Sequence, residues 1–383
     1  LQTNGESANH IDLVFLAEGY MASERASFLS AAASFMELML GNANQRLNSP
    51  LSEYAALFNV AAIFAPSLES GIDLHLEGTL VNTVFDSTTK GADGRLTTGD
   101  QNLVNFLLDR ATTSDAREMV VVLINTSLWG GGGGLSAWAT AGHPTSSEII
   151  LHETGHSYAS LEDEYVDAEI TSDYPISRLD SVHVSSSETN VPWSHWLGYE
   201  DELGTVGTYE GGYYRSTGIW RATSDSKMLH TSVPFSPPQK EAFIQRFYEA
   251  IGDYLSLSIN NQDIQAKVPD TGFLSINWTI NGDDAGQGER LSLASLMETP
   301  AVLDQTPASL TISVTTIDGT GMVREPAILA ATEQTETLDV LIGSNKADRI
   351  LGTSSDDVIM AGDGNDSLTG GSGADLLYGG AGI

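Results

Sequence analysis

The first part of the chain alternates short apolar runs with stretches in which apolar residues recur every three or four positions. Residues 22–40 have this helical spacing and are followed by Gly41, a residue type that commonly stops helices. Residues 119–124 form a continuous apolar run typical of a buried strand. The predicted strands are at residues 10–16, 57–64 and 119–124, and the predicted helices are at residues 22–40 and 101–110. This alternation predicts an α/β (α+β) fold for residues 1–252.

The pattern changes near residue 252, where alternation of apolar and polar residues replaces the helical spacing. The clearest alternating segments are residues 273–280 and 310–317, and turn signals containing Gly and Asp follow each of them. Short alternating segments separated by turns are typical of antiparallel sheets. We therefore predict a small all-β sandwich over residues 253–333.

Residues 334–383 repeat with a nine-residue period, Gly-Gly-x-Gly-x-Asp-x-apolar-x. This is the pattern of the calcium-binding repeats of RTX proteins. The glycines allow tight turns, and the aspartates supply the carboxylate oxygens that Ca²⁺ prefers. An acidic, glycine-rich linker would not keep a strict phase over four repeats. The predicted calcium ligands are Asp348, Asp357, Asp366 and Asp375, together with Gly362, Gly364, Gly371 and Gly373.

The apolar residue of each repeat is expected to face inward, so that the stacked repeats share a thin core. At least three repeats are needed for such a stack. We predict a short parallel β-roll over residues 334–383. The inward residues would be Ile350, Ile359, Leu368 and Leu377.

The composition excludes several classes of function. The net charge is −34, with 51 acidic and 17 basic residues, so a nucleic acid partner is not expected because its phosphates would be repelled. The absence of cysteine excludes disulfides and Cys-type zinc sites. No apolar run reaches the ~20 residues needed to cross a bilayer, so no membrane span is expected. A length of 383 residues, 41% of them hydrophobic, predicts a packed protein of two or three domains.

Residues 152–156, His-Glu-Thr-Gly-His, carry the strongest chemical signal in the sequence. His152 and His156 are four positions apart, just over one helical turn, so both imidazoles leave the same face of a helix and can bind one Zn²⁺ ion. Glu153 lies beside them and can act as a general base toward water that the metal has made more acidic. Residues 145–148 have the spacing of a capping box and are expected to start this helix.

A third zinc ligand must come from another segment, and the acidic residues Glu162, Asp163 and Glu164 are the nearest candidates. If the helix continued, residue 163 would lie ~10 Å beyond His156 along the helix axis, too far for both to bind one ion. The chain is therefore expected to turn back just after His156. Asp163 is the favoured ligand, and Glu162 remains its rival.

Five consecutive glycines occupy residues 130–134, before the predicted helix. Such a run is either a flexible loop or a place where another backbone approaches closely. Residues 135–140 are predicted to form a short edge strand. This strand and the glycine run could offer a substrate peptide a strand to pair with.

Residues 149–165, Ile-Ile-Leu-His-Glu-Thr-Gly-His-Ser-Tyr-Ala-Ser-Leu-Glu-Asp-Glu-Tyr, resemble the active-site signature of the M64 peptidases, the immunoglobulin A endopeptidase-like family. The likeness is scattered over roughly residues 8–326. The other similar segments are residues 12–20, 58–60, 66–71, Asn125 with the glycine run, 212–228 and 315–325.

The resemblance implies a metzincin-like catalytic domain in which His152, His156 and Asp163 bind zinc and Glu153 is the base. Met228 would lie in a turn beneath the metal. The chain departs from the family pattern at Glu162, where a small residue is usual, and after Met228, where an Arg often follows. Glu162 therefore stays open as the third ligand.

Other residues near these motifs have simpler interpretations. Tyr213 and Tyr214 could stabilise an oxyanion, although ordinary buried or surface tyrosines are the simpler expectation. His230 could be an additional ligand, but a surface position is expected. The same surface position is expected for His143, His183 and His195.

Together these features predict a secreted, monomeric zinc endopeptidase that cleaves protein substrates and binds calcium through its C-terminal repeats. Similarity to RTX exoproteins implies type I secretion from a Gram-negative bacterium, a route that reads a C-terminal signal and fits the lack of an N-terminal signal peptide. The alternative is an adhesin-like calcium-binding interaction protein with a structural or vestigial zinc site. Glu153 argues against it, because a structural site needs no base and usually has four protein ligands. The family likeness disfavours a zinc glycosidase or amidase.

Overall fold

The computed structural model of the chain describes residues 1–91, 94–114, 116–259, 263–270, 272–292 and 308–382. Two units are formed: Leu1–Gly252 with Met322–Glu325, and Asp253–Gly321 with Pro326–Ile383. Parts of the predicted β-domain, residues 260–262, 271 and 293–307, lie outside the described residues, as does Ile383 of the predicted repeat domain.

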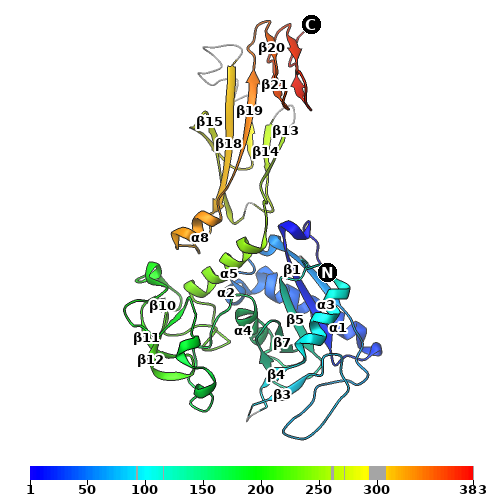
Figure 1. Ribbon diagram of the computed structural model, residues 1–383, viewed down its shortest axis with the longest axis vertical. Helices are drawn as coiled ribbons and strands as arrows, with labels where there is room; N and C mark the ends of the chain where they lie inside the picture. The colour runs from blue at the N-terminus through cyan, green and yellow to red at the C-terminus, as the bar shows by residue number, and fades with distance from the viewer. Residues whose placement is uncertain (92–93, 115, 260–262, 271, 293–307, 383) are drawn as a thin grey trace. The chain divides into compact units, whose positions relative to one another are not determined.

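A mainly parallel sheet of seven strands runs through the described part of the first unit (Figure 1). In spatial order its strands are β2 (Phe58–Ile63), β1 (Ile11–Glu18), β5 (Met119–Ile124), β7 (Ala137–Thr140), β6 (Gly131–Gly132), β4 (Leu96–Thr98) and β3 (Thr88–Lys90). β2, β1, β5 and β7 are mutually parallel, and β6 runs antiparallel to β7. The strands predicted at residues 10–16, 57–64 and 119–124 are thus confirmed.

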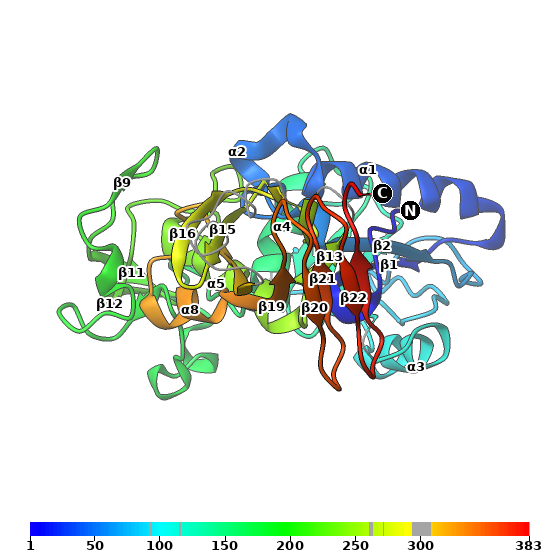
Figure 2. The ribbon, with the colours of Figure 1, turned by 90° about the horizontal axis from the view of Figure 1, so that it is seen from above.

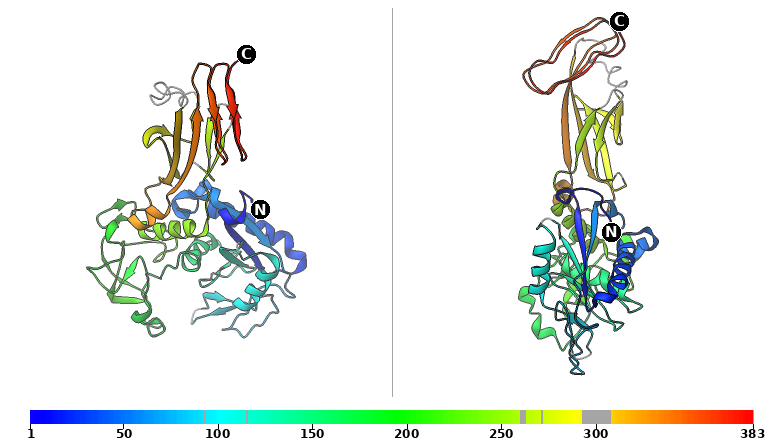
Figure 3. Two further views of the ribbon diagram at one scale, coloured as in Figure 1. Left: turned by 45° about the horizontal axis from the view of Figure 1, so that its top comes forward. Right: turned by 90° about the vertical axis from the view of Figure 1, so that its right-hand side faces the viewer.

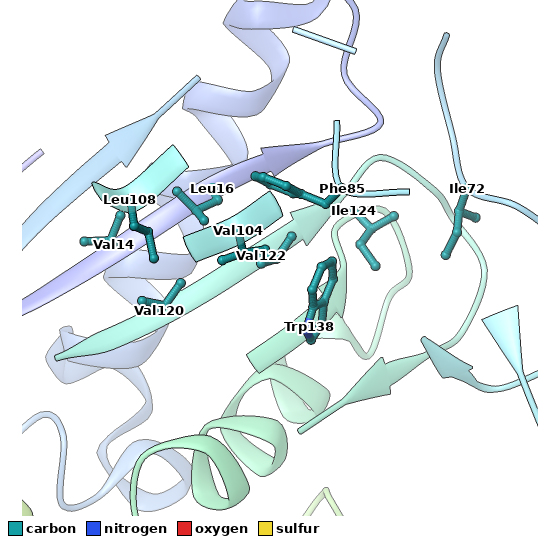
Figure 4. Close-up of a cluster of buried hydrophobic side chains, with 10 residues drawn as sticks. All are labelled: Val14, Leu16, Ile72, Phe85, Val104, Leu108, Val120, Val122, Ile124 and Trp138. Carbon is teal, nitrogen blue, oxygen red and sulfur yellow. The ribbon is translucent and has the colours of Figure 1, made fainter. Parts of the chain in front are cut away.

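Helices flank this sheet and complete its core. They are α1 (Arg25–Leu40), α2 (Gln45–Asn48), α3 (Gln101–Ala111), α4 (Ser146–Ser157) and α5 (Pro237–Ala250). Strands β1 and β5 are buried along almost their whole length, as expected for parallel strands covered on both faces. Val104 and Leu108 of α3 belong to a core cluster with residues of β1 and β5 and with Trp138 of β7 (Figure 4).

The strand after the glycine run is an interior strand, so the predicted edge strand is wrong. β7 has β5 on one side and β6 on the other, because Gly131 and Gly132 themselves form a strand. The glycines permit a close backbone approach: a Cβ built on Gly132 would overlap the carbonyl oxygen of Thr97. Gly131 and Gly132 are therefore not part of a flexible loop.

The first unit also carries two small sheets. Their strands are β10 (Gly204–Thr205) with β9 (Glu200–Asp201), and β11 (Tyr209–Gly212), β12 (Arg215–Arg221) and β8 (Val184–Ser185). Tyr213 and Tyr214 form the turn between β11 and β12, with φ values of 49° and 65°. Two consecutive side-chain-bearing residues in the left-handed region are uncommon and are held there only by their surroundings.

The second unit is rich in strands. Its described strands are β13 (Ser256–Ile259), β14 (Asp263–Lys267) and β17 (Arg290–Ser292) in one sheet, β16 (Asp283–Gln287), β15 (Leu274–Ile280), β18 (Ala308–Asp318), β19 (Gln334–Ile342), β21 (Val358–Met360) and β23 (Leu376–Tyr378) in another, and β20 (Arg349–Leu351) with β22 (Ser367–Thr369). One helix, α8 (Pro326–Ala331), is also described. β19 pairs antiparallel with β18 and parallel with β21, so one sheet continues from the alternating segment into the repeats.

The repeats wind as successive turns, each with one short strand (Figures 2 and 3). Strands of alternate repeats pair in parallel, β21 with β23 and β20 with β22. Ile350 and Ile359 are buried and Leu368 packs partly against them, as predicted. The prediction is wrong for Leu377, which is 41% exposed because it lies on the terminal strand and is covered from one side only.

The chain is therefore a mixed α/β protein with a parallel-containing sheet, followed by a strand-rich C-terminal region. None of the described helices is long and apolar enough to cross a membrane.

Candidate metal centre

Helix α4 presents His152 and His156 on one face, as the four-residue spacing predicts; His152 and Glu153 are buried and His156 is half-buried. The helix begins at Ser146, but the predicted capping box is absent. The Thr145 hydroxyl instead lies 3.0 Å from Nδ1 of His143. The expected start of the helix is therefore correct, while the expected cap is not.

The chain reverses just after the helix, as the third-ligand argument requires. Helix α4 ends at Ser157, and the Leu161 amide returns to donate a hydrogen bond to the Gly155 carbonyl at 3.0 Å. Ser160 permits the reversal with a φ of 54°. This turn brings Asp163 back toward the two histidines.

Asp163, His152 and His156 converge on one point. The Oδ1 atom of Asp163 is 3.2 Å from Nε2 of each histidine, and the two Nε2 atoms are 3.2 Å apart. On the far side of each ring, Nδ1 lies 2.9 Å from the Lys227 carbonyl for His152 and 2.6 Å from the Leu161 carbonyl for His156. A carbonyl oxygen can only accept, so each Nδ1 carries a proton and each Nε2 faces the cluster.

The cluster fits a metal ion. Asp163 is 5% exposed, and apart from its contacts with the two imidazoles its Oδ1 atom receives no hydrogen bond from the described residues. A buried carboxylate oxygen without a donor is costly unless a cation meets it. Two imidazole nitrogens and this oxygen are a donor set suited to a divalent transition metal.

The structure places Asp163, and not Glu162, with the histidines. Glu162 uses its backbone N–H to donate to Nε2 of His183 at 3.0 Å, and its carboxylate is not part of the cluster. The second oxygen of Asp163, Oδ2, accepts a hydrogen bond from the Tyr214 hydroxyl at 2.6 Å. Tyr214 thus contacts the candidate ligand itself, a contact that sequence spacing does not reveal.

Electrostatic attraction within the cluster is strong. Burial, the largest single effect, would lower the pKa of His156. The charge and hydrogen bond of Asp163, the charge of Glu153 and the Leu161 carbonyl together outweigh burial, and the pKa of His156 is raised to about 10. Burial acts to raise the pKa of Asp163, but the two imidazoles, His156 foremost, hold that pKa well below its usual range. The metal-free cluster therefore pairs a protonated imidazole with an ionised carboxylate.

Glu153 lies beside this cluster in a confined space. The residue is 9% exposed, and burial raises the pKa of its carboxyl above the usual range against the lowering effect of His152 and His156. A Cβ built on Gly131 would lie 2.5 Å from Oε1 of Glu153. The glycine strand β6 can therefore pack directly against the helix face that carries Glu153.

Met228, which the family resemblance places in a turn beneath the metal, packs against helix α4 at Gly155. Its side chain is fully buried, and its sulfur lies 3.0 Å from the position that a Cβ on Gly155 would take. The Met228 carbonyl accepts a hydrogen bond from the amide of Glu164 at 2.9 Å. The turn that contains Met228 thus contacts both the helix and the loop that follows it.

The remaining histidines range from exposed to fully buried, and His143 and His195, for which a surface position is expected, are half-buried. His230 has a side chain that is 63% exposed and pairs with Asp225, outside the cluster. The surface position expected for His183 is wrong, because this residue is 0% exposed and hydrogen bonds to Glu164 at 2.8 Å. No spacing rule in the sequence points to His183, since tertiary packing alone brings it to the metal loop.

The aspartates of the repeats bind backbone amides of their own or the neighbouring turn. Asp357 Oδ2 accepts from the Thr353 amide at 2.6 Å, and Asp366 Oδ1 accepts from the Asp348 amide at 2.9 Å. The predicted glycines Gly362, Gly364, Gly371 and Gly373 all have positive φ. Among the described residues the aspartates do not form a group of three carboxylates within reach of one ion.

A buried His–His–Asp cluster on an α/β scaffold defines a candidate metal-binding protein, and the family match makes the class more specific. The family described as IgA Peptidase M64 matches residues 1–205, more than half of the 383 residues. The chain belongs to this peptidase family, as the signature at residues 149–165 predicts. The RTX calcium-binding nonapeptide repeat matches residues 335–368 and 351–383. No curated protein matches the chain.

Proposed function

We propose that the protein is a zinc endopeptidase and that His152, His156 and Asp163 hold the zinc ion. The observation that carries this proposal is the convergence of two imidazole Nε2 atoms and the buried Oδ1 atom of Asp163, each 3.2 Å from the others, in a member of a peptidase family. Three protein ligands with one position left open are typical of catalytic zinc, whereas structural zinc usually has four. Glu153 beside the cluster favours catalysis over a purely structural site.

When bound, zinc supplies Lewis acidity, which polarises a scissile carbonyl and lowers the pKa of water to roughly 7. Glu153 then acts as the general base, taking a proton from the attacking water and passing it to the leaving amine. Its buried position, which disfavours the charged carboxylate, makes the carboxyl a stronger proton acceptor than an exposed one. The water oxygen bonds to the carbonyl carbon and the C–N bond breaks, so one fragment leaves with a new carboxylate and the other with a new amine.

We further propose a metzincin-like catalytic domain over residues 1–252, in which Met228 supports the metal loop from below. Residues 253–333 would form a β-sandwich, and residues 334–383 a parallel β-roll. Parallel pairing of alternate repeats supports the roll. The proposed calcium ligands are the carboxylates of Asp348, Asp357, Asp366 and Asp375, with carbonyl oxygens of Gly362, Gly364, Gly371 and Gly373.

The C-terminal repeats support secretion of this protein, since RTX repeats are typical of secreted bacterial proteins. We propose that the protein acts outside the cell, where calcium is abundant enough to order the repeats. Export by the type I route is part of this proposal. The substrates would be proteins that the secreted enzyme meets outside the cell.

Hydrolysis of unfolded casein tests the proposed function, with bound zinc measured on the same samples. The parent protein is expected to hold one zinc ion and to lose activity with a strong chelator. Glu153→Gln is expected to keep the zinc and to lower kcat/KM by about 10²–10⁴-fold, the usual contribution of a general base. Glu162→Gln is the matched control, because it neutralises a neighbouring acid outside the cluster. Cleavage by Glu153→Gln at the parent rate would overturn the mechanism.

A further inference from the structure

His183 bridges the two residues that flank Asp163. Its Nε2 atom lies 3.0 Å from the amide of Glu162, and its Nδ1 atom lies 2.8 Å from Oε1 of Glu164. The side chain is fully buried. One imidazole therefore ties down the residue before Asp163 and the residue after it.

The direction of these hydrogen bonds follows from the groups involved. The amide of Glu162 can only donate, so Nε2 of His183 must accept, and the proton of the neutral ring lies on Nδ1. That N–H donates to the carboxylate of Glu164. The two contacts thus select one tautomer, and the imidazole cannot rotate without losing both.

Glu164 is itself held from every side. Its Oε2 accepts from the hydroxyl of Ser226 at 2.7 Å, and its Oε1 also accepts from Nε2 of Gln239 at 2.9 Å. Both partners are fully buried, as is Glu164. A buried carboxylate with several donors is fixed in orientation, because losing one donor leaves a desolvated charge.

The remaining polar groups of Asp163 are also engaged. Its carbonyl accepts from the amide of Tyr213 at 2.9 Å, and its Oδ2 accepts from the hydroxyl of Tyr214 at 2.6 Å. Of its two carboxylate oxygens, Oδ1 accepts no further hydrogen bond from the described residues, and it faces the two histidines. Hydrogen bonds thus hold the backbone carbonyl and the Oδ2 atom of Asp163, while Oδ1 stays directed at the site that would hold the metal.

We propose that His183, acting through Glu162 and Glu164, is a positioning residue that presets Oδ1 of Asp163 for the metal. This inference rests on the proposed zinc site. His183 touches neither the metal ligands nor the substrate, and its effect comes from restricting the loop before the ion binds. Partners of this kind around a metal site typically change metal affinity by 10- to 100-fold when they are removed.

The test measures the zinc dissociation constant of the full chain by competition with a chromophoric chelator. His183→Leu removes both hydrogen bonds while keeping a buried side chain, and a 10- to 100-fold weaker affinity is expected. Glu164→Gln, which keeps the shape and can still accept from His183, is expected to retain most of the affinity. The visible spectrum of the Co²⁺-substituted protein, which reports ligand geometry, should change in His183→Leu and not in Glu164→Gln.

The chain offers a matched control in a second histidine–glutamate pair, in which Glu241 is buried and His195 is half-buried. His195 Nε2 lies 2.6 Å from Oε2 of Glu241, and the other ring nitrogen faces Glu325, so this pair is not part of the metal loop. His195→Leu is expected to lower the unfolding temperature and to leave zinc affinity and the Co²⁺ spectrum unchanged. If His183→Leu does not fold, Ser226→Ala serves as the second variant. It removes the hydroxyl that donates to Glu164 and accepts from the Met228 amide and from Gln239, and a several-fold loss of zinc affinity is expected.

The outcomes separate this inference from the proposed function. A parent protein that binds no zinc would overturn the zinc site and the inference with it. A parent that binds zinc, with His183→Leu equal to it in affinity and spectrum, would overturn the positioning role alone. Equal weakening in His183→Leu and His195→Leu would also overturn it, since general destabilisation would then explain the loss.

Discussion

Gly133 packs against His156 so closely that a Cβ built on Gly133 would overlap the Cβ of the histidine. The overlap involves a helix residue whose ring is fixed by the Leu161 carbonyl, so little can move aside. Gly133→Ala is therefore expected to displace the imidazole and weaken metal binding about tenfold or more. Overpacking of this kind also costs about 1–3 kcal/mol of stability. Zinc titration and thermal unfolding measure the two effects.

The matched control for that substitution is Gly207→Ala in the same unit. The nearest atom to a Cβ at Gly207 is 3.4 Å away, an ordinary van der Waals separation. This variant should bind zinc and unfold like the parent. Equal metal affinity in Gly133→Ala and Gly207→Ala would show that Gly133 does not constrain His156.

Tyr214→Phe should weaken metal binding without displacing the ligands from the fold. The hydroxyl donates to Oδ2 of Asp163 at 2.6 Å, and its removal leaves that buried oxygen without the donor. We expect a zinc dissociation constant about tenfold higher, in the range found when a partner of a metal ligand is removed. Tyr209→Phe is the control, because that hydroxyl bonds the Thr205 carbonyl at the surface. Parent-like zinc affinity in Tyr214→Phe would contradict the role given to this contact.

Zinc binding is expected to release a proton at neutral pH. The pKa of His156 is raised to about 10 in the metal-free cluster, so its imidazole is protonated at pH 7 and must lose the proton from Nε2 to bind a metal. The apparent affinity should therefore rise about tenfold per pH unit and level off as the pH passes about 10. Calorimetry in two buffers of different ionisation enthalpy counts the released protons. A buffer-independent heat of binding would be incompatible with this assignment.

The same shift predicts the pH dependence of the metal-free protein's stability. The folded pKa of His156, about 10, exceeds its reference value of 6.5, so the ion pair with Asp163 stabilises the fold fully below about pH 6.5. That contribution is lost as the pH rises through about 10. In Asp163→Asn the imidazole has no ionised partner, so this loss at high pH should be absent. Thermal unfolding of the metal-free proteins between pH 6 and 10 compares the two, and identical profiles would refute the assignment.

Site residues that local helix geometry positions can be predicted from the sequence, whereas those that tertiary packing brings to the site cannot. His152 and His156 are predictable because helix geometry alone places residues four apart on one face. A turn that brings an acidic residue back to the histidines is predictable, because a straight helix would carry it too far away. The spacing favours Asp163 but leaves Glu162 as its rival, and tertiary packing alone separates the two. His183 and Tyr214 are not predictable, since they lie 19 positions from Glu164 and 51 from Asp163 and reach the site only through tertiary packing.

The errors have equally local causes. Residues 135–140 are predicted to form an edge strand because the preceding glycine run has no strand propensity of its own and is not expected to pair with them. In the structure, Gly131 and Gly132 pair with that strand because the absence of side chains lets them lie against Thr97 and helix α4. Leu377 is predicted to be inward from its phase in the repeat, yet phase does not tell whether a neighbouring turn covers it.

Calcium should stabilise the repeats through Asp366. Its Oδ2 atom is buried and receives no hydrogen bond from the described residues, while Oδ1 accepts the Asp348 amide, so one oxygen remains for a cation. Ligand binding to the folded state alone adds about 2.7 kcal/mol of stability at a concentration 100 times the dissociation constant. Calorimetric unfolding of the full chain should therefore show a transition that calcium moves to higher temperature.

Asp366→Asn should reduce that calcium-induced shift, because the amide keeps the shape of the side chain but gives up the charge that attracts the cation. Asp363→Asn removes the same charge from the same turn, but Asp363 is exposed and is not the aspartate of the nine-residue pattern. This variant should keep the full calcium-induced rise in unfolding temperature. A comparable reduction of the calcium-induced temperature shift in both variants would mean that calcium binds through the overall negative charge of the repeats. A loss confined to Asp366→Asn would instead assign the effect to a defined ligand, because both variants carry the same net charge.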